Sequence, residues 1–461
     1  MRLALLLNLL FLVIITSCHK EPNYNLNKTQ ILTFSTDTVL FDTVFTTIGS
    51  TSKRLKVYNP TNKPVRISEI KLNGGKSSAY QLNINGQYID QSHDLELSAR
   101  DSLTIFVKVN INPTNNSLPF IVSDSLSFVT NGYKQTVNLL AYGQNAVFFN
   151  EKVISHDTIW DNKLPFVIYN SVIVNENVKL VIKQGTRIYF HKDSKFLISG
   201  SLNIEGIKTD TVSFSSDRLE TIYEDEPGQW SGIHFLKTSK DNRIEYATIK
   251  NAAIGIQVDS ASSNHNPKLI LSNSIIKYMA IAGIVLYNSN AHIFNSLFYN
   301  CGKHLLYGAL GGNYIIKQNT FAAYNFHTSH QTPAVYLSDN LAVNNSTKTA
   351  LLNVNLVNNI ITGNLAEELV LDKKGGAEII LNLQNNLLKT KNTTFNINGN
   401  LINLDPLFTN SRVGNFKLIK TSPAVNKGVN LSADDYYQRY LSKDIKGNIR
   451  VFPSELGCYE N

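Results

Sequence analysis

The stretches Ser272-Asn-Ser-Ile-Ile-Lys277, Phe294-Asn-Ser-Leu-Phe-Tyr299 and Lys317-Gln-Asn-Thr-Phe-Ala322 decide the fold, because they share one pattern. Each has an amide residue at its second position and two apolar or near-apolar residues at its fourth and fifth positions. The pattern recurs, once with Tyr in place of the amide, in Glu245-Tyr-Ala-Thr-Ile-Lys250, Val357-Asn-Asn-Ile-Ile-Thr362 and Gln384-Asn-Asn-Leu-Leu-Lys389. Self-similarity of this kind predicts a solenoid, in which each coil packs on its neighbours.

The spacing of these segments gives the size of one coil. Their second apolar residues are Ile249, Ile276, Phe298, Phe321, Ile361 and Leu388. Most neighbours in this series are separated by roughly two dozen residues, which corresponds to one coil of a solenoid. The separation between Phe321 and Ile361 is much longer and predicts an extra loop around 339–349.

A column of mostly amide residues stands three positions before these anchors, at Tyr246, Asn273, Asn295, Gln318, Asn358 and Asn385. Equivalent corners of stacked β-coils lie ~4.8 Å apart. Asn tolerates a left-handed backbone there, and its amide can bond to the next amide in the stack. We therefore expect an Asn ladder in this column. The alternative is that these amides bind a sugar.

Several segments resemble the right-handed parallel β-helix proteins of the pectate-lyase-like fold. They are Leu180-Val-Ile-Lys-Gln-Gly-Thr-Arg-Ile-Tyr-Phe190, Gly200-Ser-Leu-Asn-Ile-Glu-Gly206, Val212-Ser-Phe-Ser-Ser-Asp217 and Pro227-Gly-Gln-Trp-Ser-Gly-Ile-His-Phe235. The resemblance covers about 175–461 and is specific for the fold but not for an activity. It implies a right-handed parallel β-helix over 151–400.

The end of the chain is similar to the closing elements of bacterial β-helix proteins, so 401–461 is expected to be a C-terminal cap. The residues that show this similarity are Asp444, Gly447 and Arg450, followed by Glu455-Leu-Gly-Cys-Tyr-Glu460. A solenoid needs such a cap because its last coil exposes an open edge and an apolar core. We expect an ion pair between Asp444 and Arg450, a plugging role for Tyr459, and a packing role for Cys458. Cys301 and Cys458 do not form a disulfide framework, and whether they pair stays open.

Residues 30–148 predict an N-terminal β-sandwich. In Ser102-Leu-Thr-Ile-Phe-Val-Lys-Val-Asn-Ile111 apolar residues alternate with mostly polar ones, as in a half-buried strand. Turn signals such as Asn59-Pro-Thr-Asn62 and Asn131-Gly132 separate similar short runs. The stretch 53–67 resembles immunoglobulin-like domains of the abnormal-spindle/hydin type. That resemblance implies a spacer or a binding platform, and the whole chain is predicted to be all-β.

The N-terminal segment, 1–18, predicts a secreted, lipid-anchored protein. Arg2 precedes an apolar stretch from Leu3 to Ile15, which is too short to span a bilayer and is typical of a signal peptide. The ending Ile15-Thr-Ser-Cys18 resembles a bacterial lipobox, which implies lipidation of Cys18 after cleavage. Residues 19–29 form a polar tether. We expect a cell-envelope lipoprotein of the outer membrane, facing the periplasm or the outside.

The charge distribution argues against nucleic acid as a partner. The formal net charge is +8, from 43 Lys and Arg and 35 Asp and Glu, but no basic block stands out. Only 17% of residues are charged, while 43% are hydrophobic. This composition, rich in Tyr and Phe, favours β structure.

The acidic stretch 217–226 is the one candidate metal site, since Ca²⁺ takes six to eight oxygen ligands. Asp217, Glu220, Glu224 and Asp225 are its candidate ligands. A solvated loop between two coils explains the same residues. No other cofactor is expected.

Catalytic carboxylates are scarce where a β-helix enzyme would need them. Residues 260–338 contain no Asp or Glu, so a glycosidase site with paired carboxylates is disfavoured there. The histidines of this region, among them His327 and His330, are the remaining bases. Two histidines alone do not make a metal site. We assign no catalytic residue.

Tyrosines recur through the coils and give the only positive indication of a ligand. Tyr287 and Tyr307, together with His327 and His330, are the candidate ligand-binding residues, because Tyr offers a flat ring and a hydroxyl to a sugar. The preferred hypothesis is a lipid-anchored envelope protein that binds a glycan without turning it over. The alternatives are a polysaccharide lyase or glycoside hydrolase, and a structural or adhesive protein.

Overall fold

The computed structural model describes residues 23–29, 31–324, 330–344 and 346–461. The predicted signal peptide (1–18), its predicted lipidation site Cys18, and His327 therefore lie outside the described residues. The chain divides into two compact units, Met1–Asn145 and Ala146–Asn461, which are treated separately. Within the described ranges, no helix combines the length and the apolar character needed to cross a membrane.

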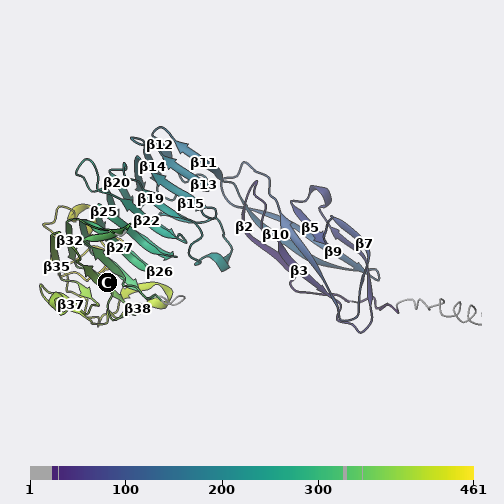
Figure 1. Cartoon of the computed structure of the whole chain (residues 1–461). Coiled ribbons are helices and arrows are strands. Elements are labelled where there is room, and N and C mark those ends of the chain that lie inside the picture. Colours follow the sequence, from purple (N-terminus) through teal and green to yellow (C-terminus); the bar gives the residue numbers. More distant parts are fainter. Residues whose placement is uncertain (1–22, 30, 325–329, 345) are drawn as a thin grey trace, which may run out of the picture. The chain divides into compact units, whose positions relative to one another are not determined.

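The first unit contains two five-stranded sheets with a common apolar core (Figure 1). One sheet, in spatial order, contains β1 (Thr33–Phe34), β3 (Lys53–Tyr58), β8 (Ser102–Val109), β5 (Tyr80–Ile84) and β6 (Gln87–Tyr88). The other contains β2 (Thr38–Phe45), β10 (Tyr133–Gln144), β9 (Phe120–Thr130), β4 (Val65–Leu72) and β7 (Gln91–Leu97). A short 3₁₀ turn, η1 (Gly75–Ser77), follows β4. This unit is the predicted β-sandwich.

Alternation of side chains builds this core as the sequence predicts. In β8, Leu103, Ile105 and Val107 are buried while the residues between them are not. The turn after β3 is closed by the buried Asn59, whose Nδ2 donates to the carbonyls of Lys63, Leu97 and Ser98. The β9–β10 hairpin turns at Asn131 and Gly132, both with positive φ, as a two-residue turn of this kind requires.

The second unit is a right-handed parallel β-helix whose coils each contribute strands to three parallel ladders. The first ladder contains β12 (Thr158–Trp160), β14 (Lys179–Lys183), β17 (Ser201–Glu205), β20 (Asn242–Glu245), β23 (Leu269–Ser272), the second halves of β25 (Ala282–Phe294) and β27 (His304–Lys317), β32 (Leu352–Val357) and β35 (Ile379–Gln384).

The second ladder follows the first along every coil. It contains the first half of β13 (Phe166–Val174), then β15 (Arg187–Phe190), β18 (Val212–Ser216), β21 (Ala247–Lys250), β24 (Ile275–Met279), β26 (Leu297–Cys301), β28 (Thr320–Ala323), β33 (Ile360–Gly363), β36 (Leu387–Leu388) and β37 (Leu401–Ile402). At its start β11 (Val147–Ile154) pairs with β13.

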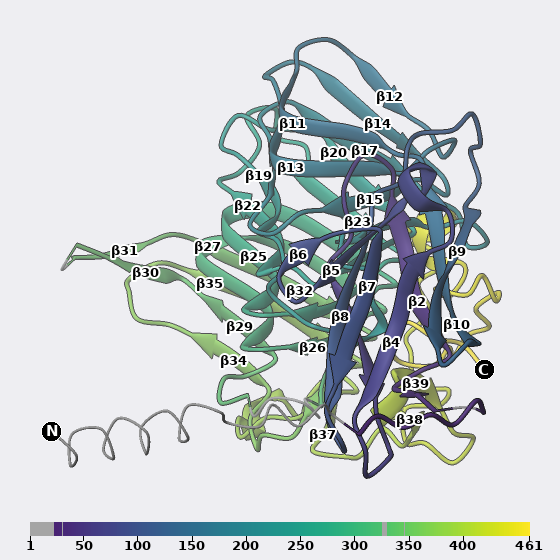
Figure 2. The same ribbon diagram turned by 90° about the vertical axis from the view of Figure 1, so that its right-hand side faces the viewer.

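The third ladder closes each coil. It contains the second half of β13, then β16 (Lys195–Ile198), β19 (Gly232–Phe235), β22 (Ile254–Asp259), the first halves of β25 and β27, β29 (Val335–Ser338) and β34 (Leu369–Asp372). Loops leave the coils at several points. The loop after β18 includes η2 (Thr221–Tyr223), and the hairpin of β30 (Asn340–Val343) and β31 (Ser346–Thr349), seen in Figure 2, is the predicted extra loop.

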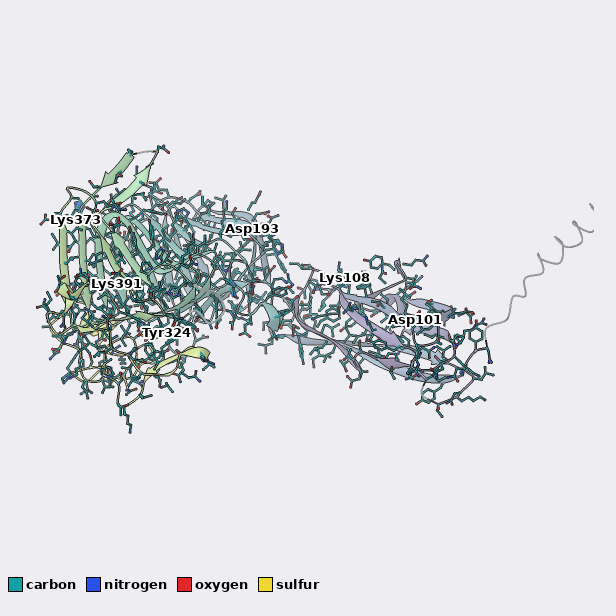
Figure 3. All side chains as sticks on the ribbon, turned by 60° about the horizontal axis from the view of Figure 1, so that its bottom comes forward. Asp101, Lys108, Asp193, Tyr324, Lys373 and Lys391 are labelled. Atoms are coloured by element: carbon teal, nitrogen blue, oxygen red, sulfur yellow. The ribbon has the colours of Figure 1, made fainter. Side chains whose placement is uncertain are left out.

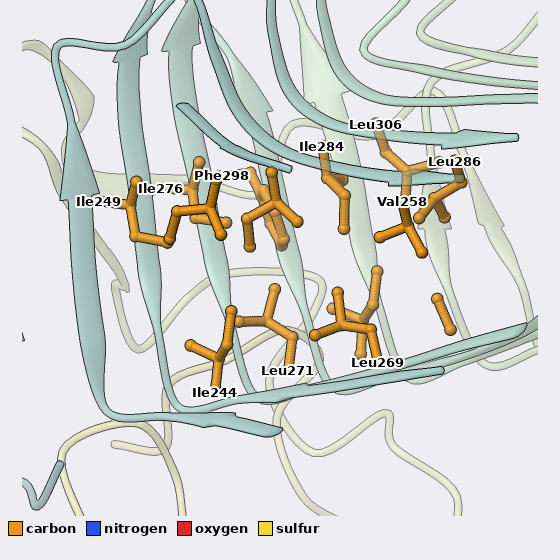
Figure 4. Close-up of a cluster of buried hydrophobic side chains, with 14 of the residues drawn as sticks. Ile244, Ile249, Val258, Leu269, Leu271, Ile276, Ile284, Leu286, Phe298 and Leu306 are labelled. Carbon is orange, nitrogen blue, oxygen red and sulfur yellow. The ribbon is translucent and has the colours of Figure 1, made fainter. Parts of the chain in front are cut away.

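Stacked apolar side chains fill the interior of the coils (Figure 4). The anchors Ile249, Ile276 and Phe298 are fully buried one above another, opposite Ile244 and Leu271 from the first ladder. Each coil alone would leave its inner face in water, so stacking is what buries it. The repeat read from the sequence is thus the core of the solenoid.

All six residues of the predicted corner column adopt a left-handed backbone, with φ between 49° and 59°. The inward-pointing ladder, however, stands one residue later along the chain. The side chains of Ser274, Ser296, Asn319, Asn359, Asn386 and Asn400 each accept a hydrogen bond from the backbone N–H of the equivalent residue in the preceding coil. The predicted column contains one bond of the expected kind, from Asn295 Nδ2 to Asn273 Oδ1 at 3.2 Å, but the continuous ladder stands one position later than predicted.

The predicted column faces the C-terminal segment, 403–461. Asn358 exchanges two hydrogen bonds with the backbone of Val429, at 3.0 and 2.9 Å, and Asn385 donates to the carbonyl of Lys427. Asn295 accepts from Arg450, and the amide of Gln318 lies 3.0 Å from Ser454 Oγ. These contacts occupy the amides of Asn295, Gln318, Asn358 and Asn385, which are therefore not available to a sugar.

The C-terminal segment runs along the corner between the first and second ladders. It contains β38 (Phe408–Asn410), η4 (Ser411–Val413), β39 (Asn415–Leu418) and the wide helical turn η5 (Tyr437–Leu441), while η3 (Thr393–Phe395) precedes it. Three small apolar clusters attach it to both ladders. Tyr324, labelled in Figure 3, packs its ring edge-on against Phe408.

The expected Asp444–Arg450 ion pair is replaced by two separate arrangements. Arg450 Nη1 lies 3.0 Å from Glu460 Oε2, with both side chains buried. Asp444 instead accepts backbone N–H groups of Lys446, Asn448 and Glu460. The prediction of this pair was wrong because sequence proximity did not reveal which carboxylate lies beside the guanidinium. Tyr459 is buried as expected, and Cys458 is a buried free thiol whose pKa is raised to about 12 by burial.

Candidate functional site

The outer side of the third ladder presents a row of aromatic and polar side chains, here called the aromatic face. The strand registers align His234, Gln257, Val285, Tyr307 and Tyr336 in one column, with Asp259 beside Tyr287 in the neighbouring column. The aromatic face consists of His234, Gln257, Asp259, Tyr287, His304, Tyr307, Tyr336 and Asp372. All eight are half-buried.

The tyrosine rings form a continuous surface. Tyr307 and Tyr336 come from successive coils and stack with centroids 5.4 Å apart and planes 7° apart. Tyr287 meets Tyr307 edge to face at 6.4 Å. The hydroxyl of Tyr336 donates to Asp372 Oδ2 at 2.6 Å, and burial together with this bond raises the pKa of that hydroxyl. The ring of Tyr336 is therefore fixed at its hydroxyl, and Tyr307 stacks on it.

His304 stands beside the tyrosine stack with a defined proton position. Its ring centroid lies 5.3 Å from that of Tyr307 and 5.9 Å from that of Tyr336. Nδ1 lies 2.7 Å from the carbonyl oxygen of Pro333, which can only accept, so Nδ1 carries the proton. Burial lowers the pKa of His304, so the neutral ring leaves Nε2 as an acceptor.

At the other end of the row, His234, Gln257 and Asp259 form a hydrogen-bonded group. Asp259 accepts from His234 Nε2 at 2.6 Å and from Gln257 Nε2 at 3.0 Å. Burial would raise the pKa of Asp259, but these two bonds outweigh it and hold the pKa below its usual value. The fully buried Lys268 lies behind Asp259, and burial lowers its pKa to about 8. Its Nζ donates to the carbonyls of Lys237 and Asp259, which gives it a structural role.

The carboxylates of the aromatic face are too far apart for a glycosidase pair. Asp259 and Asp372 are separated by four strand steps of the third ladder. At ~4.8 Å per step this is about 19 Å, whereas glycosidase carboxyl groups lie roughly 5–9.5 Å apart. The face therefore does not hold two acids across one glycosidic bond.

The acidic loop candidates point to different partners instead of a common centre. Asp217 pairs with His191 Nδ1 at 2.7 Å, Glu220 pairs with Arg218, and Glu224 lies 3.7 Å from Lys250. No group of three or more His, Cys, Asp or Glu that could hold a metal occurs within the described ranges. The structure thus does not bring Asp217, Glu220, Glu224 and Asp225 together as ligands.

His330 is not a surface residue. Its Nε2 lies 3.3 Å from Glu368 Oε1, with side-chain exposures of 2% and 0%. Glu368 also accepts the N–H groups of Ala334 and Leu365. The pair fastens the loop ahead of β29, so His330 cannot reach a ligand on the aromatic face.

The tyrosines of the coils fall into three environments that the sequence could not separate. Tyr287, Tyr307 and Tyr336 lie on the aromatic face. Tyr278, Tyr299 and Tyr324 face outward from the second ladder and pack under the C-terminal segment. Tyr314 lies fully buried in the core. Strand register, which depends on the exact length of each coil, is the signal that distinguishes them.

The comparison with protein families supports the β-helix class. A family model described as "Right handed beta helix region" matches residues 139–321, which is less than half of the chain. This range begins in β10 of the first unit and covers the β-helix from β11 to β28. No curated protein matches the chain.

Two solved structures show slight similarity. A protein of unknown function from Porphyromonas gingivalis W83 has 10% identity and a TM-score of 0.19, covering 27% of this chain and 51% of that one. A family 123 glycoside hydrolase from Clostridium perfringens has 10% identity and a TM-score of 0.18, covering 26% of each chain. The chain thus spans about half of the first protein and a quarter of the second. Similarity this low carries no functional argument.

Proposed function

We propose that the protein binds a glycan of the cell envelope along the aromatic face, without chemical turnover. The observation that supports this most is the ordered stack of Tyr307 and Tyr336, flanked by Tyr287 and by polar groups at both ends. Flat aromatic surface matches the C–H face of a pyranose ring, while the hydroxyls, His234 and Gln257 offer hydrogen bonds to its rim. The separation of Asp259 from Asp372 argues against a hydrolase.

A glycan array with Tyr307→Ala and Tyr336→Ala tests this proposal. Removing one ring from the stack should weaken binding at least tenfold, because each ring contributes contact area and fixes its neighbour. Tyr133→Ala, on an exposed tyrosine of the first unit, is the control and should bind as the unchanged protein does. Absence of any glycan binding by the unchanged protein would instead favour a structural or adhesive role.

The second candidate function is a polysaccharide lyase, and His304 is the observation that favours it. Its unprotonated Nε2, next to Tyr307 and Tyr336, has the form of a general base. A lyase assay that follows the rise in unsaturated uronide absorbance decides between the two functions. Release of uronide that is abolished by His304→Gln would establish the lyase and contradict the binding-only proposal.

The envelope location is part of the same proposal. Lipidation at Cys18, the polar tether 19–29 and an immunoglobulin-like spacer at 30–148 would hold the β-helix away from an outer membrane, on its periplasmic or outer side. Cys18→Ala should abolish incorporation of labelled palmitate and release the protein from membranes. Cys301→Ala, at a buried thiol, is the matched control and should leave labelling intact.

A further inference from the structure

A depression lies on the outer side of the second ladder, away from the aromatic face. Ser213 pairs with Arg187 on one side and with Thr248 on the other. Ser215 pairs with Tyr189, and Lys250 takes the corresponding place in the following coil. Because short hydroxyl side chains are set among long ones, the sheet surface sinks at this point.

The loop that joins β18 to β19 lies beside the depression and forms with it a half-open cavity of about 410 Å³. Its lining includes Tyr189, Ser213, Ser215, Arg218, Thr248 and Lys250. Hydrogen bonds fasten the loop to the sheet. Asn251 Nδ2 donates to the carbonyls of Glu224 and Glu226 at 3.0 and 2.8 Å, and Lys250 Nζ donates to that of Glu224 at 3.0 Å. The cavity is therefore largely preformed, at the small end of the range for ligand sites.

The charged groups around the cavity already have partners. Arg218 binds Glu220 through Nε and Nη2, at 3.2 and 3.3 Å, and its guanidinium lies 3.8 Å from the ring centroid of Tyr223. Lys250 is paired with Glu224. An anionic ligand would compete with Glu220 for Arg218 and with Glu224 for Lys250, and a cationic ligand would compete with these two cations for the same carboxylates. The cavity therefore favours a ligand without net charge.

The hydroxyls of the floor, in contrast, are available. The side chains of Ser213 and Thr248 have no hydrogen-bond partner in the described part of the chain. A hydroxyl both donates and accepts, so a pair of them matches the alternating hydroxyls of a sugar ring. Tyr189 supplies an aromatic wall beside this floor.

We propose that this cavity binds a single neutral sugar unit, either free or at the end of a glycan. The cavity has the volume for one sugar ring, hydroxyls on its floor and an aromatic wall. Because its charged side chains already pair with one another, it should bind an uncharged hydroxylated ring in preference to a uronate or a calcium ion. The site lies on a different ladder from the aromatic face. It does not depend on the function proposed above, and the two can fail separately.

Isothermal titration calorimetry on the full chain tests the proposal with D-glucose, D-galactose, D-mannose and N-acetyl-D-glucosamine, and with D-glucuronate as the charged comparator. At least one neutral sugar should bind with a Kd on the order of 1 mM, and D-glucuronate at least tenfold more weakly. Thr248→Val, which keeps the side-chain shape but removes the hydroxyl, should weaken binding about tenfold, the effect of ~1.4 kcal/mol. Ser213→Leu should fill the cavity and abolish binding.

Tyr133→Ala, on an exposed tyrosine of the first unit, is the control and should leave the affinity for the neutral sugar unchanged. Monosaccharide binding that is lost in Tyr307→Ala and kept in Thr248→Val would place the sugar on the aromatic face and overturn the proposal. So would no binding of any neutral sugar, equal binding of D-glucuronate, or binding that requires calcium. If Ser213→Leu fails to fold, the isosteric Thr248→Val decides by itself.

Discussion

At the scale of single residues, Asp444 organises the end of the chain. Its carboxylate accepts hydrogen bonds from the backbone of Lys446, Asn448 and Glu460 at 2.7–3.0 Å, and also from Asn448 Nδ2. A hydrogen bond to a charged acceptor contributes about 1.5–3 kcal/mol when its loss leaves a buried donor unpaired. Asp444→Ala should therefore lower the free energy of unfolding by about 3 kcal/mol. Urea denaturation followed by circular dichroism measures this.

Asp444→Asn is the matched variant, since it keeps the size and one acceptor oxygen. It should lose less stability than Asp444→Ala. Glycan binding measured well below the melting temperature should be unchanged in both variants. An altered affinity with an unchanged melting temperature would contradict the structural role of Asp444.

A second residue-scale prediction concerns pH. His292 packs against Phe294 and Tyr436, and its Nδ1 has no partner among the residues described. Burial, with a smaller effect of Lys317, lowers its pKa from 6.5 to about 4. As the pH falls, His292 therefore binds a proton in the unfolded chain before it does so in the folded protein. The contribution of neutral His292 to the free energy of unfolding is fully present above pH 6.5 and is lost as the pH falls towards 4.

At about 1.4 kcal/mol per pKa unit, this loss should reach about 3 kcal/mol at pH 4. His292→Phe removes the titrating group and keeps the ring packing. Its free energy of unfolding should match or exceed that of the unchanged protein at pH 7, and the difference between the two should grow towards pH 4. Parallel pH curves for the two proteins would show that His292 does not titrate this way.

At the scale of elements, the sequence predicted the corners but not which side chain points inward. The left-handed residues, such as Asn273 and Asn358, were found because Asn at a fixed offset from an apolar pair is a strong signal. The residue after each of them is also small or polar, for example Ser274 and Asn359, so composition alone could not decide between the two columns. The positive φ turns the first residue outward and the next one inward, and only the backbone shows this.

The inward-pointing ladder of side chains should contribute strongly to the stability of the coils that contain Asn319, Asn359 and Asn386. Asn359 accepts from the backbone N–H and the Nδ2 of Asn319, and donates to Ile316 O and Asn386 Oδ1, all within 3.1 Å. Asn359→Leu would leave buried partners on both neighbouring coils unsatisfied, so the free energy of unfolding should fall by about 3 kcal/mol.

Asn355→Ala provides the control within the same coil. Asn355 accepts one hydrogen bond from Asn382 at the surface, so its loss should cost less than about 0.5 kcal/mol. Chemical denaturation of both variants, with the unchanged protein, measures the contrast. Similar losses in the two variants would mean that the ladder adds little beyond ordinary surface contacts.

At the scale of the β-helix unit as a whole, the C-terminal segment links coils that are distant in sequence. It contacts Asn385 through Lys427, reaches Glu245 through Arg439 and returns to Asn358 at Gly457. The sequence predicted a closing element because its residues resemble those of related chains. The sequence did not predict the course of this segment along the corner. Its binding partners there are polar corner residues such as Asn358 and Asn385, which the sequence analysis expected to bond to one another.

Because the C-terminal segment contacts several coils, a buried contact in it should contribute more to the free energy of unfolding than an exposed one. Arg450 lies fully buried between Asn295 Oδ1, Gly457 O and Glu460. Arg439 pairs with Glu245 while about half exposed. Arg450→Met removes the positive charge beside the buried Glu460 carboxylate and the donor to Asn295 Oδ1 and Gly457 O, which should cost about 3–5 kcal/mol. Arg439→Met removes a surface pair and should cost less than about 1 kcal/mol.

Hydrogen exchange gives a second measure with spatial resolution. In Arg450→Met the amides of β26 and β28, which the segment covers, should exchange faster, while those of β14 and β17, far from these contacts, should keep their protection. Equal protection of β26 and β28 in both arginine variants would contradict the view that the segment holds the coils together. Uniform loss across all ladders would instead show that the coils unfold as one cooperative unit, with Arg450 contributing to it globally.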